Sequence, residues 1–598
     1  MSQTIKNRKD VPSGNKWNLA SLFKDSEAWE AGLKELEALI PEISGFKGSL
    51  GDSAERLRGC FDFFNSLEIL EERLGYYAML RKEEDVADSD SMGRYSRYMA
   101  VATKSSTEAS YLKPEIQSLP DELLASYMKD PVLKEFRIPL ERMIRYKPHI
   151  LSEKEESLLA MQAEFAQTAR KAFSALTNGD MNFGTIEVKG EEKGLTNSTF
   201  GVFLLDPDRA IRKQAFQQFY TVFEGHKNTL SELYGGSVLR DIYSAKVRGF
   251  SSAREASLFP DNVPVDVYDN LIASVSDNLA PLHRYYALRK RVLGLDALHL
   301  YDTKVSLIPD MSVRHSFDDG VNVVLKALSP LGEEYGSVLK KGLSSGWVDR
   351  YENKGKRSGA FSAGSYKGDP YILMNYKEDD IRDVFTLAHE GGHSMHSWFS
   401  VRNNPFQNYN YTIFEAEVAS TFNEQLLGRY LMDHSESKEM TLYLLGRQID
   451  DILGTIYRQT MFAEYEMKCH ALVEAGKPLT VDSLRFEYRT LLEKYFGPDV
   501  VLEEQADLEG LRIPHFYNAF YVYKYATGLS AAMALSEMVL DGGDAEGESY
   551  LNFLKSGGSR FPLDSLKAAG VDMSRPEAVN KALGRFAALV DRFESELL

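Results

Sequence analysis

Three histidines and one glutamate fall within eight residues of the stretch LAHEGGHSMHSW, which runs from Leu387 to Trp398. His389, Glu390 and His393 form the pattern H-E-x-x-H. On a helix, residues four apart lie on one face with about 6 Å of rise between them, so both imidazoles can bind one zinc ion. Glu390 lies beside that face and is placed to act as general base toward water at the metal. The pattern therefore predicts a catalytic zinc site.

Two glycines, Gly391 and Gly392, stand inside this helical stretch. Each costs a helix roughly 1 kcal/mol relative to alanine. The alternative to a metal site is a chance pattern on a solvated helix, but the flanks DVFTLA and SMHSWF are apolar enough to bury the motif. We therefore expect a neighbouring element to pack closely against the glycines.

A third protein ligand must come from elsewhere in the chain. His396 is seven residues from His389, about 10.5 Å along a straight helix, so one ion cannot bind both. His396 is interpreted either as a neighbour that hydrogen-bonds inside the site or as a core histidine. The metzincin pattern requires glycine and histidine where this chain has His396 and Phe399, which excludes that class.

The next helical stretch, residues 410–433, offers three carboxylates. Glu417 and Glu424 share one helical face, whereas Glu415 points elsewhere. A ligand with a supporting residue one or two turns further on is the useful arrangement at a metal. We therefore predict Glu417 as the third zinc ligand and Glu424 as its supporting residue, with an ordinary exposed glutamate as the alternative for Glu424.

The composition limits the class of protein and its partners. The chain has 598 residues, a net charge of -18 and no large basic block, which argues against nucleic acid and anionic membranes as partners. Two cysteines, Cys60 and Cys469, provide no disulfide framework and indicate a reducing compartment. A polar start and the lack of a long apolar run predict no signal peptide and no membrane span. The cytoplasm is the expected location.

The elements around the motif are mostly helical by their apolar spacing, so the expected class is mainly α. A hairpin is expected over 181–205 and a short strand over 370–376, PYILMNY. We predict an N-terminal helical domain over 1–190 and a catalytic domain over 191–598. Nucleotide-binding loops and the nucleophilic serine motif are not found in the sequence.

HEGGHSMH followed by FEAEVAST resembles the M3 (thimet-type) family of zinc oligopeptidases, and in particular its oligoendopeptidase F group. The resemblance extends to GKRSGAFS (355–362), DPYILMNY (369–376) and HFYNAFYVYKYATG (515–528). It implies a large helical zincin-type fold that encloses a deep cleft, with a small β-sheet near the active site. It also implies one zinc ion per chain, Glu417 as the third ligand, and oligopeptide substrates. Relatives usually carry a larger residue where this chain has Gly391.

Residues 515–528 are dense in donors that could stabilise an oxyanion. Composition alone favours an aromatic core helix for this segment. The resemblance instead implies a histidine and tyrosines across the metal from the HExxH helix. His515 and Tyr523 are the predicted donors, and Tyr517 and Tyr521 are the alternates.

The resemblance also implies that the GAFS segment and the PYILMNY strand line the substrate cleft. Gly359, Ala360 and Tyr371 are the predicted substrate-binding residues. PYILMNY is expected to be an edge strand that pairs with an extended peptide, with a plain structural strand as the alternative.

Together these residues predict a zinc-dependent endopeptidase that hydrolyses internal bonds of short peptides. A nearer rival is an exo-acting zinc peptidase, a carboxypeptidase or dipeptidyl carboxypeptidase, in which Arg357 or Lys524 would hold the substrate's terminal carboxylate. A non-catalytic peptide-binding protein is the rival from another class, although it would have no reason to keep Glu390. Whether the chain is a monomer or a homodimer stays open.

Overall fold

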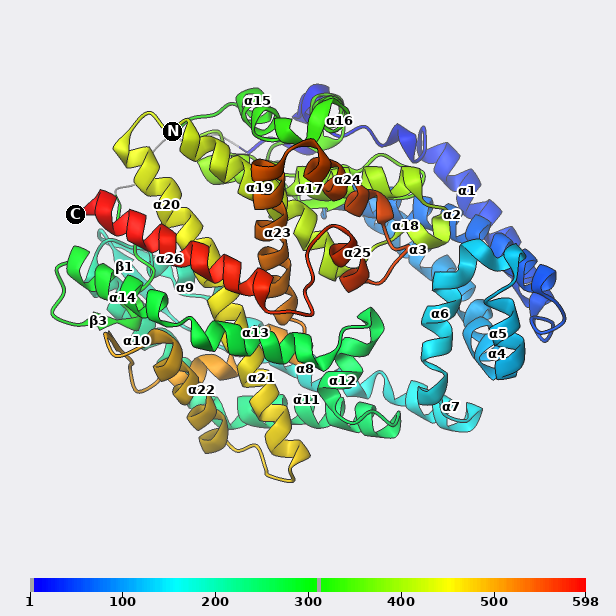
Figure 1. Cartoon of the computed structure of the whole chain (residues 1–598), viewed down its shortest axis with the longest axis horizontal. Helices are drawn as coiled ribbons and strands as arrows, with labels where there is room; N and C mark the ends of the chain where they lie inside the picture. Colours follow the sequence, from blue (N-terminus) through cyan, green and yellow to red (C-terminus); the bar gives the residue numbers. More distant parts are fainter. Residues whose placement is uncertain (1–4, 309–312) are drawn as a thin grey trace. The chain divides into compact units, whose positions relative to one another are not determined.

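The computed structural model describes residues 5–308 and 313–598, apart from the side chain of residue 153. Nearly all of its regular structure is helical, which confirms the mainly α class (Figure 1). The chain divides into two compact units, each assembled from three separate stretches. Unit 1 comprises Met1–Pro148, Ser312–Asp433 and Ala532–Val571; unit 2 comprises His149–Met311, His434–Ala531 and Asp572–Leu598. None of these boundaries falls near 190/191, and the two-domain division expected there stays a prediction.

Unit 1 consists of helices around one small sheet. Its helices are α1 (Ser26–Leu39), α2 (Ala54–Glu84), α3 (Ser89–Glu108), α4 (Leu112–Ser118), α5 (Asp121–Tyr127), α6 (Arg137–Arg145), α15 (Phe317–Ala327), α16 (Gly332–Ser344), α17 (Ile381–Asn403), α18 (Phe406–Tyr409), α19 (Ile413–Asp433), α24 (Asp544–Ser556) and α25 (Pro562–Ala568). Its strands are β4 (Val348–Asp349), β5 (Phe361–Ala363) and β6 (Tyr371–Leu373).

The core of unit 1 joins the N-terminal helices to this sheet. Ser53 caps α2, since its side chain accepts the N–H of Arg56 at 3.1 Å. Trp29 of α1 is fully buried, and its indole N–H donates to the Leu74 carbonyl of α2 at 3.0 Å. The same hydrophobic cluster includes Tyr371 of β6. The sheet is thus fixed to the helices by a shared core.

The sheet has the order β4-β6-β5, with β4 parallel and β5 antiparallel to β6. The prediction that 370–376 forms an edge strand is therefore wrong, because β6 is the central strand. Its backbone is paired on both sides, Ile372 opposite Val348 and Ser362. The edges of the sheet belong to β4 and β5 instead.

Unit 2 is also helical. Its helices are α7 (Glu153–Gln162), α8 (Thr168–Ala175), α9 (Asn197–Phe203), α10 (Arg209–Gly225), α11 (Lys227–Val247), α12 (Ala253–Leu258), α13 (Val265–Asp277), α14 (Ala280–Val292), α20 (Lys438–Ile452), α21 (Arg458–Glu474), α22 (Val481–Phe496) and α26 (Glu577–Leu597). Helix α23 (Tyr523–Gly542) begins in unit 2 and ends in unit 1. Among the described helices, none is long and apolar enough to cross a membrane.

The short strands of unit 2 differ from the expected hairpin. Strands β1 (Thr185–Val188) and β2 (Glu191–Gly194) pair antiparallel, as predicted, but they occupy only the first half of 181–205. Thr196 then caps α9, because its hydroxyl accepts the N–H of Thr199 at 3.1 Å. A second pair, β3 (Leu298–His299) with β7 (Val500–Val501), was too short to be recognised in the sequence.

Candidate metal centre and active site

Helix α17 carries the H-E-x-x-H residues. It starts after Asp380, whose carboxylate accepts the N–H of Arg382 at 3.0 Å, and Asp383 adds a second acid to the first turn. His389 and His393 lie one turn apart with ring centroids separated by 4.9 Å. The helix predicted around the motif is therefore present, and it places both imidazoles on one face.

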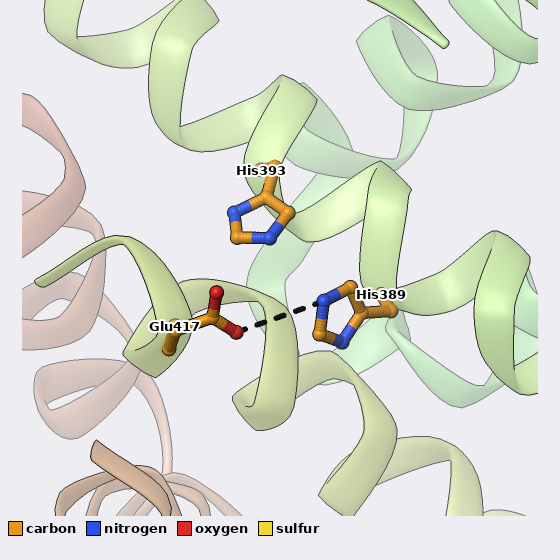
Figure 2. A group of neighbouring side chains, drawn as sticks. All are labelled: His389, His393 and Glu417. Atoms are coloured by element: carbon orange, nitrogen blue, oxygen red, sulfur yellow. Dashed lines mark ion pairs between the residues drawn. The ribbon is translucent and has the colours of Figure 1, made fainter. Parts of the chain in front are cut away.

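Glu417 joins these histidines from α19, which packs along α17. Figure 2 shows the carboxylate pointing toward both rings. One ligand atom from each of His389, His393 and Glu417 lies within 4.8 Å of the other two. The Nε2 atom of His389 is 3.7 Å from a Glu417 oxygen. Two imidazoles and one carboxylate, each partly exposed, are the donor set of a catalytic zinc site. The residues therefore fit this metal.

Gly392 explains how α19 comes so close. A Cβ atom at this position would lie 2.6 Å from the Ala419 carbonyl oxygen and 2.7 Å from the Ser420 Cα atom. Only glycine allows this approach of two backbones. Gly391 differs, since a Cβ atom there would meet only Leu339, at 3.4 Å. The close packing expected of the glycines thus concerns Gly392.

Supporting contacts orient both imidazoles. The Nδ1 atom of His389 lies 2.7 Å from a Glu424 oxygen, so an N–H there donates to the carboxylate and leaves Nε2 free to bind a metal. The Ala416 carbonyl forms a hydrogen bond with His393. The structure thus places Glu424 where a supporting residue is required.

Electrostatics at the site favour a cation. Burial alone would lower the pKa of His389, but the hydrogen bond and charge of Glu424, with Glu390 and Glu417, raise it to about 9. Burial and the charge of His389 lower the pKa of His393 to about 3. Three carboxylates therefore surround the two imidazoles, and the imidazole of His393 is readily available as a neutral ligand.

Glu390 is 6% exposed and lies against the sheet. Burial raises its pKa to about 7, and the charges of Glu417 and Glu424 add to this effect. The Ser362 N–H of β5 forms a hydrogen bond with its carboxylate, while Oε2 has no partner among the described residues. The Ser362 hydroxyl lies 2.8 Å from that of Ser394 on α17. A carboxyl group with this pKa is suited to take up and release a proton near neutral pH.

His396 does not contact the ligands. It is 1% exposed and stacks on Tyr411 with ring centroids 3.5 Å apart. Burial, together with the smaller effect of the nearby His393 charge, lowers its pKa well below the usual value. Neither ring nitrogen has a hydrogen-bond partner among the described residues. Of the two interpretations, a neutral core histidine agrees with this position.

The predicted substrate-binding residues occupy different environments. Gly359 adopts a φ of +85°, and its carbonyl accepts the Asn375 side-chain N–H at 2.9 Å. Ala360 follows and leads directly into β5. Tyr371 is 1% exposed, and its hydroxyl donates to the Asn18 carbonyl at 2.7 Å. Tyr371 thus helps to hold the N-terminal segment, while Gly359 and Ala360 lie at the start of the edge strand.

The tyrosines of the 515–528 segment, which belong to unit 2, fall into two groups. Tyr523 is fully buried and packs on Tyr268 with centroids 5.3 Å apart. Tyr517 is 3% exposed and stacks on Phe173 at 4.5 Å. Burial raises the pKa of both hydroxyls.

The other group of tyrosines lies beside His515. This histidine is exposed and lies in the 3-10 turn Pro514–Tyr517. Its ring lies 6.4 Å from that of Tyr521 and 6.2 Å from that of Tyr525, and the two tyrosine rings are 5.5 Å apart. Both tyrosines are partly exposed. We call His515, Tyr521 and Tyr525 the His515 group. It gathers three polar groups that are open to solvent, whereas Tyr523 and Tyr517 face the core.

Sequence reasoning did not single out Ser362, Ser394 or Tyr525. Ser362 acts on Glu390 through its backbone N–H, which every non-proline residue has, so its identity gives no signal. The GAFS motif contained it, but pointed to substrate binding instead. Tyr525 was one donor in a segment with several tyrosines, and only the turn before α23 decides which of them are exposed.

A helical fold with an HExxH helix, a glutamate from the next long helix beside both histidines and a buried Glu390 next to a strand is typical of a metallopeptidase of the zincin type. Comparison with known proteins agrees. The model of Peptidase family M3 matches residues 202–585, and that of Oligopeptidase F matches residues 115–183. The chain therefore belongs to peptidase family M3.

Individual relatives extend this likeness over the whole chain. An oligoendopeptidase F homolog of Borreliella burgdorferi is 42% identical over 98% of this chain and 99% of its own. The oligopeptidase PepF of Bacillus subtilis is 41% identical over 99% of this chain and 89% of its own. A crystal structure from Chlamydophila abortus, 34% identical, superposes with a TM-score of 0.93 and covers 99% of this chain and 100% of that one.

Proposed function

We propose that this M3 peptidase hydrolyses internal bonds of oligopeptides with one zinc ion held by His389, His393 and Glu417. The observation that carries the proposal is the convergence of these three ligands within 4.8 Å, with Glu390 buried beside them. The substrate class is supported by the names of the relatives, which are oligoendopeptidases and oligopeptidases. The predicted enzyme class and family agree with these comparisons.

The side chains and backbone groups around this site have separate roles in the reaction. A bound zinc ion supplies a Lewis acid that makes water more acidic and polarises the scissile carbonyl. Glu390 accepts the proton of the attacking water and passes it to the leaving amine. The Ser362 N–H holds the carboxylate at the edge of the sheet during both transfers. Glu424 keeps His389 in the tautomer whose Nε2 faces the metal.

An oxyanion requires a donor from the protein. We assign this role to the His515 group, with His515 and Tyr521 as its leading members, because these side chains expose their polar atoms. Tyr523, the tyrosine predicted first, and the alternate Tyr517 would have to leave buried positions to serve. We expect His515→Ala to lower kcat with zinc content unchanged.

Substrate binding is proposed at the outer edge of β5, which begins after Gly359 and Ala360 and where the Ser362 N–H already bonds to Glu390. An extended peptide can add to such an edge through main-chain hydrogen bonds, which requires little sequence preference. Tyr371 lies on the central strand β6, opposite Ala363 of β5, and so helps to hold this edge strand in place.

An exo-acting enzyme would need a cation to hold a terminal carboxylate. Arg357 already lies 3.4 Å from a carboxylate oxygen of Glu83, and Lys524 is paired with Asp261 at 2.6 Å. Both candidate cations therefore have partners, which supports internal cleavage. We further propose the cytoplasm as the location, since Cys60 and Cys469 are free, buried thiols.

The decisive experiment compares the wild type with Glu390→Gln at equal zinc content on an internally quenched peptide of about ten residues with both ends blocked. We expect internal cleavage by the wild type and a loss of at least about 10²-fold in kcat for the variant. Cleavage that requires a free C-terminus would replace the proposal with an exopeptidase. An unchanged kcat in the variant would exclude Glu390 as the base.

A further inference from the structure

A strained turn lies inside the His515 group. Phe520 precedes Tyr521 and has a φ of +58°, in the left-handed region. This conformation is unfavourable for a bulky residue, so the surrounding structure must hold it there. The Phe520 ring is 2% exposed and packs on Tyr268 at 5.8 Å and on His470 at 4.6 Å.

The backbone of the turn is held by Glu466 of α21. This side chain is fully buried, and its Oε1 accepts the Phe520 N–H at 3.1 Å. Two further contacts hold carbonyls of the same turn. The Ser257 hydroxyl donates to Ala519 at 3.0 Å, and Arg240 donates to Tyr517 at 3.3 Å.

We propose that Glu466 is a positioning residue, which fixes the left-handed turn at Phe520 and thereby orients His515 and Tyr521 for catalysis. This inference rests on the proposed function of the His515 group. Glu466 itself touches neither side chain. Without its carboxyl group, the Phe520 N–H would be buried and unpaired, which is unfavourable, and the strained backbone could relax.

Several titratable groups of the described residues lie near Glu466, and Tyr234, Tyr268 and Cys469 are among those that interact with it electrostatically. The Nδ1 atom of His470 donates to the Glu466 backbone carbonyl at 2.8 Å, and its Nε2 lies 3.4 Å from Asp241, which also pairs with Arg240 at 2.7 Å. Burial, aided by the charge of Asp241, raises the pKa of Glu466 well above its usual value. Burial therefore favours the neutral form of this carboxyl group, and glutamine is a close substitute because its carbonyl oxygen can accept the same N–H.

The test measures kcat, KM, zinc content and melting temperature for Glu466→Leu and Glu466→Gln, each also combined with His515→Ala. We expect Glu466→Leu to lower kcat by about 10- to 100-fold with little change in KM, the cost of a misplaced catalytic group. Glu466→Gln should keep most of the activity. In the His515→Ala background, Glu466→Leu should cause a smaller loss, because only Tyr521 is then left to be misplaced. If Glu466→Leu does not fold, Glu466→Asp takes its place in the test. The aspartate keeps the carboxyl group but is one methylene shorter, which moves the acceptor oxygen away from the Phe520 N–H.

Two results would overturn the inference. One is a folded Glu466→Leu with wild-type kcat; the other is an equal fold-loss with and without His515, which would indicate a general structural effect. If His515→Ala alone leaves kcat unchanged, the proposed role of His515 fails. The coupling of Glu466 is then measured against Tyr521→Phe, and full additivity there overturns the inference as well.

Discussion

Glu415 and Glu417 stand two residues apart on α19 and have opposite environments. Glu417 is partly exposed and turns toward His389 and His393. Glu415 is fully buried, and its Oε2 accepts the Thr412 N–H at 3.3 Å. Two positions correspond to about 200° on a helix, so one carboxylate faces the two histidines while the other caps the first turn. The face predicted from the sequence separates these two positions, and the role of Glu417 as a metal ligand stays a prediction.

Stability should depend on pH through Glu415. Burial raises its pKa to about 7 in the folded protein, from an ordinary value of 4.5. Its contribution is therefore full below about pH 4.5 and is lost as the pH rises through about 7. We expect Glu415→Gln to gain roughly 1–3 kcal/mol of unfolding free energy over the wild type at pH 8, and little at pH 4.5. Urea unfolding of the metal-free proteins at both pH values tests this, with the exposed Glu436→Gln as control. An equal difference at both values would contradict it.

Removal of the support behind His389 should weaken the metal site without abolishing it. Glu424→Ala deletes the acceptor of the Nδ1 hydrogen bond, so we expect metal affinity to fall by about 10- to 100-fold. Glu424→Gln keeps an acceptor and should lose less. Competition with a chromophoric zinc chelator measures both. Asp433→Asn, on the exposed end of the same helix, is the control; a variant of Glu424 that matched it would refute the assignment.

At the scale of elements, the metal centre depends on the contact between α17 and α19. Asn423 adds a polar link, since its side-chain N–H donates to the Ala388 carbonyl at 3.0 Å and its oxygen accepts from the Tyr335 hydroxyl at 3.0 Å. The ligands of both helices are thus held by a backbone contact and by a buried amide. The contact between the two helices therefore brings the three candidate ligands together.

The two adjacent glycines provide a matched test of this contact. Gly392→Ala places a Cβ atom against the α19 backbone, so we expect a loss of about 1–3 kcal/mol in unfolding free energy and of bound zinc. Gly391→Ala meets only Leu339 and should keep zinc, with a gain of up to about 1 kcal/mol from helix propensity. Denaturant unfolding and zinc analysis compare the pair. Equal behaviour of the two variants would show that helix propensity, not packing, governs the position.

Relations between residues close together in the sequence could be predicted, whereas contacts between distant segments could not. His389, Glu390 and His393 are related by local helical spacing, which is visible in a single stretch. The position of β6 was misjudged because its partner β4 is only two residues long and lies far away in the sequence. Which tyrosine side chains of 515–528 are exposed depends on the left-handed turn at Phe520. No sequence pattern predicts that backbone conformation.

At the scale of the whole molecule, each compact unit holds one thiol. Cys60 lies in unit 1 and Cys469 in unit 2, and both are buried. Burial raises the pKa of Cys60 to about 12 and also raises that of Cys469. Each cysteine is therefore an unreactive reporter of the integrity of its own unit.

We expect neither thiol to react with a disulfide reagent in native buffer, and both to react in denaturant. Single-cysteine variants, Cys60→Ser and Cys469→Ser, assign the signals across a urea titration. Rapid labelling of either native thiol would contradict the burial described above. Reaction of the two thiols in separate urea ranges would identify the units as independent folding blocks.

The interleaving of the two units has a consequence for synthesis on the ribosome. The stretch that bears the metal ligands leaves the ribosome long before Ala532–Val571, the last part of unit 1. That late part includes Tyr550 and Phe553, whose rings pack on Phe422 of α19 at 3.6 Å and on His396 of α17 at 5.4 Å. A nascent chain therefore lacks the packing behind its ligand helices until nearly the whole protein has been made. The order of the segments along the chain thus delays the formation of a centre that could cut other, still unfolded chains nearby.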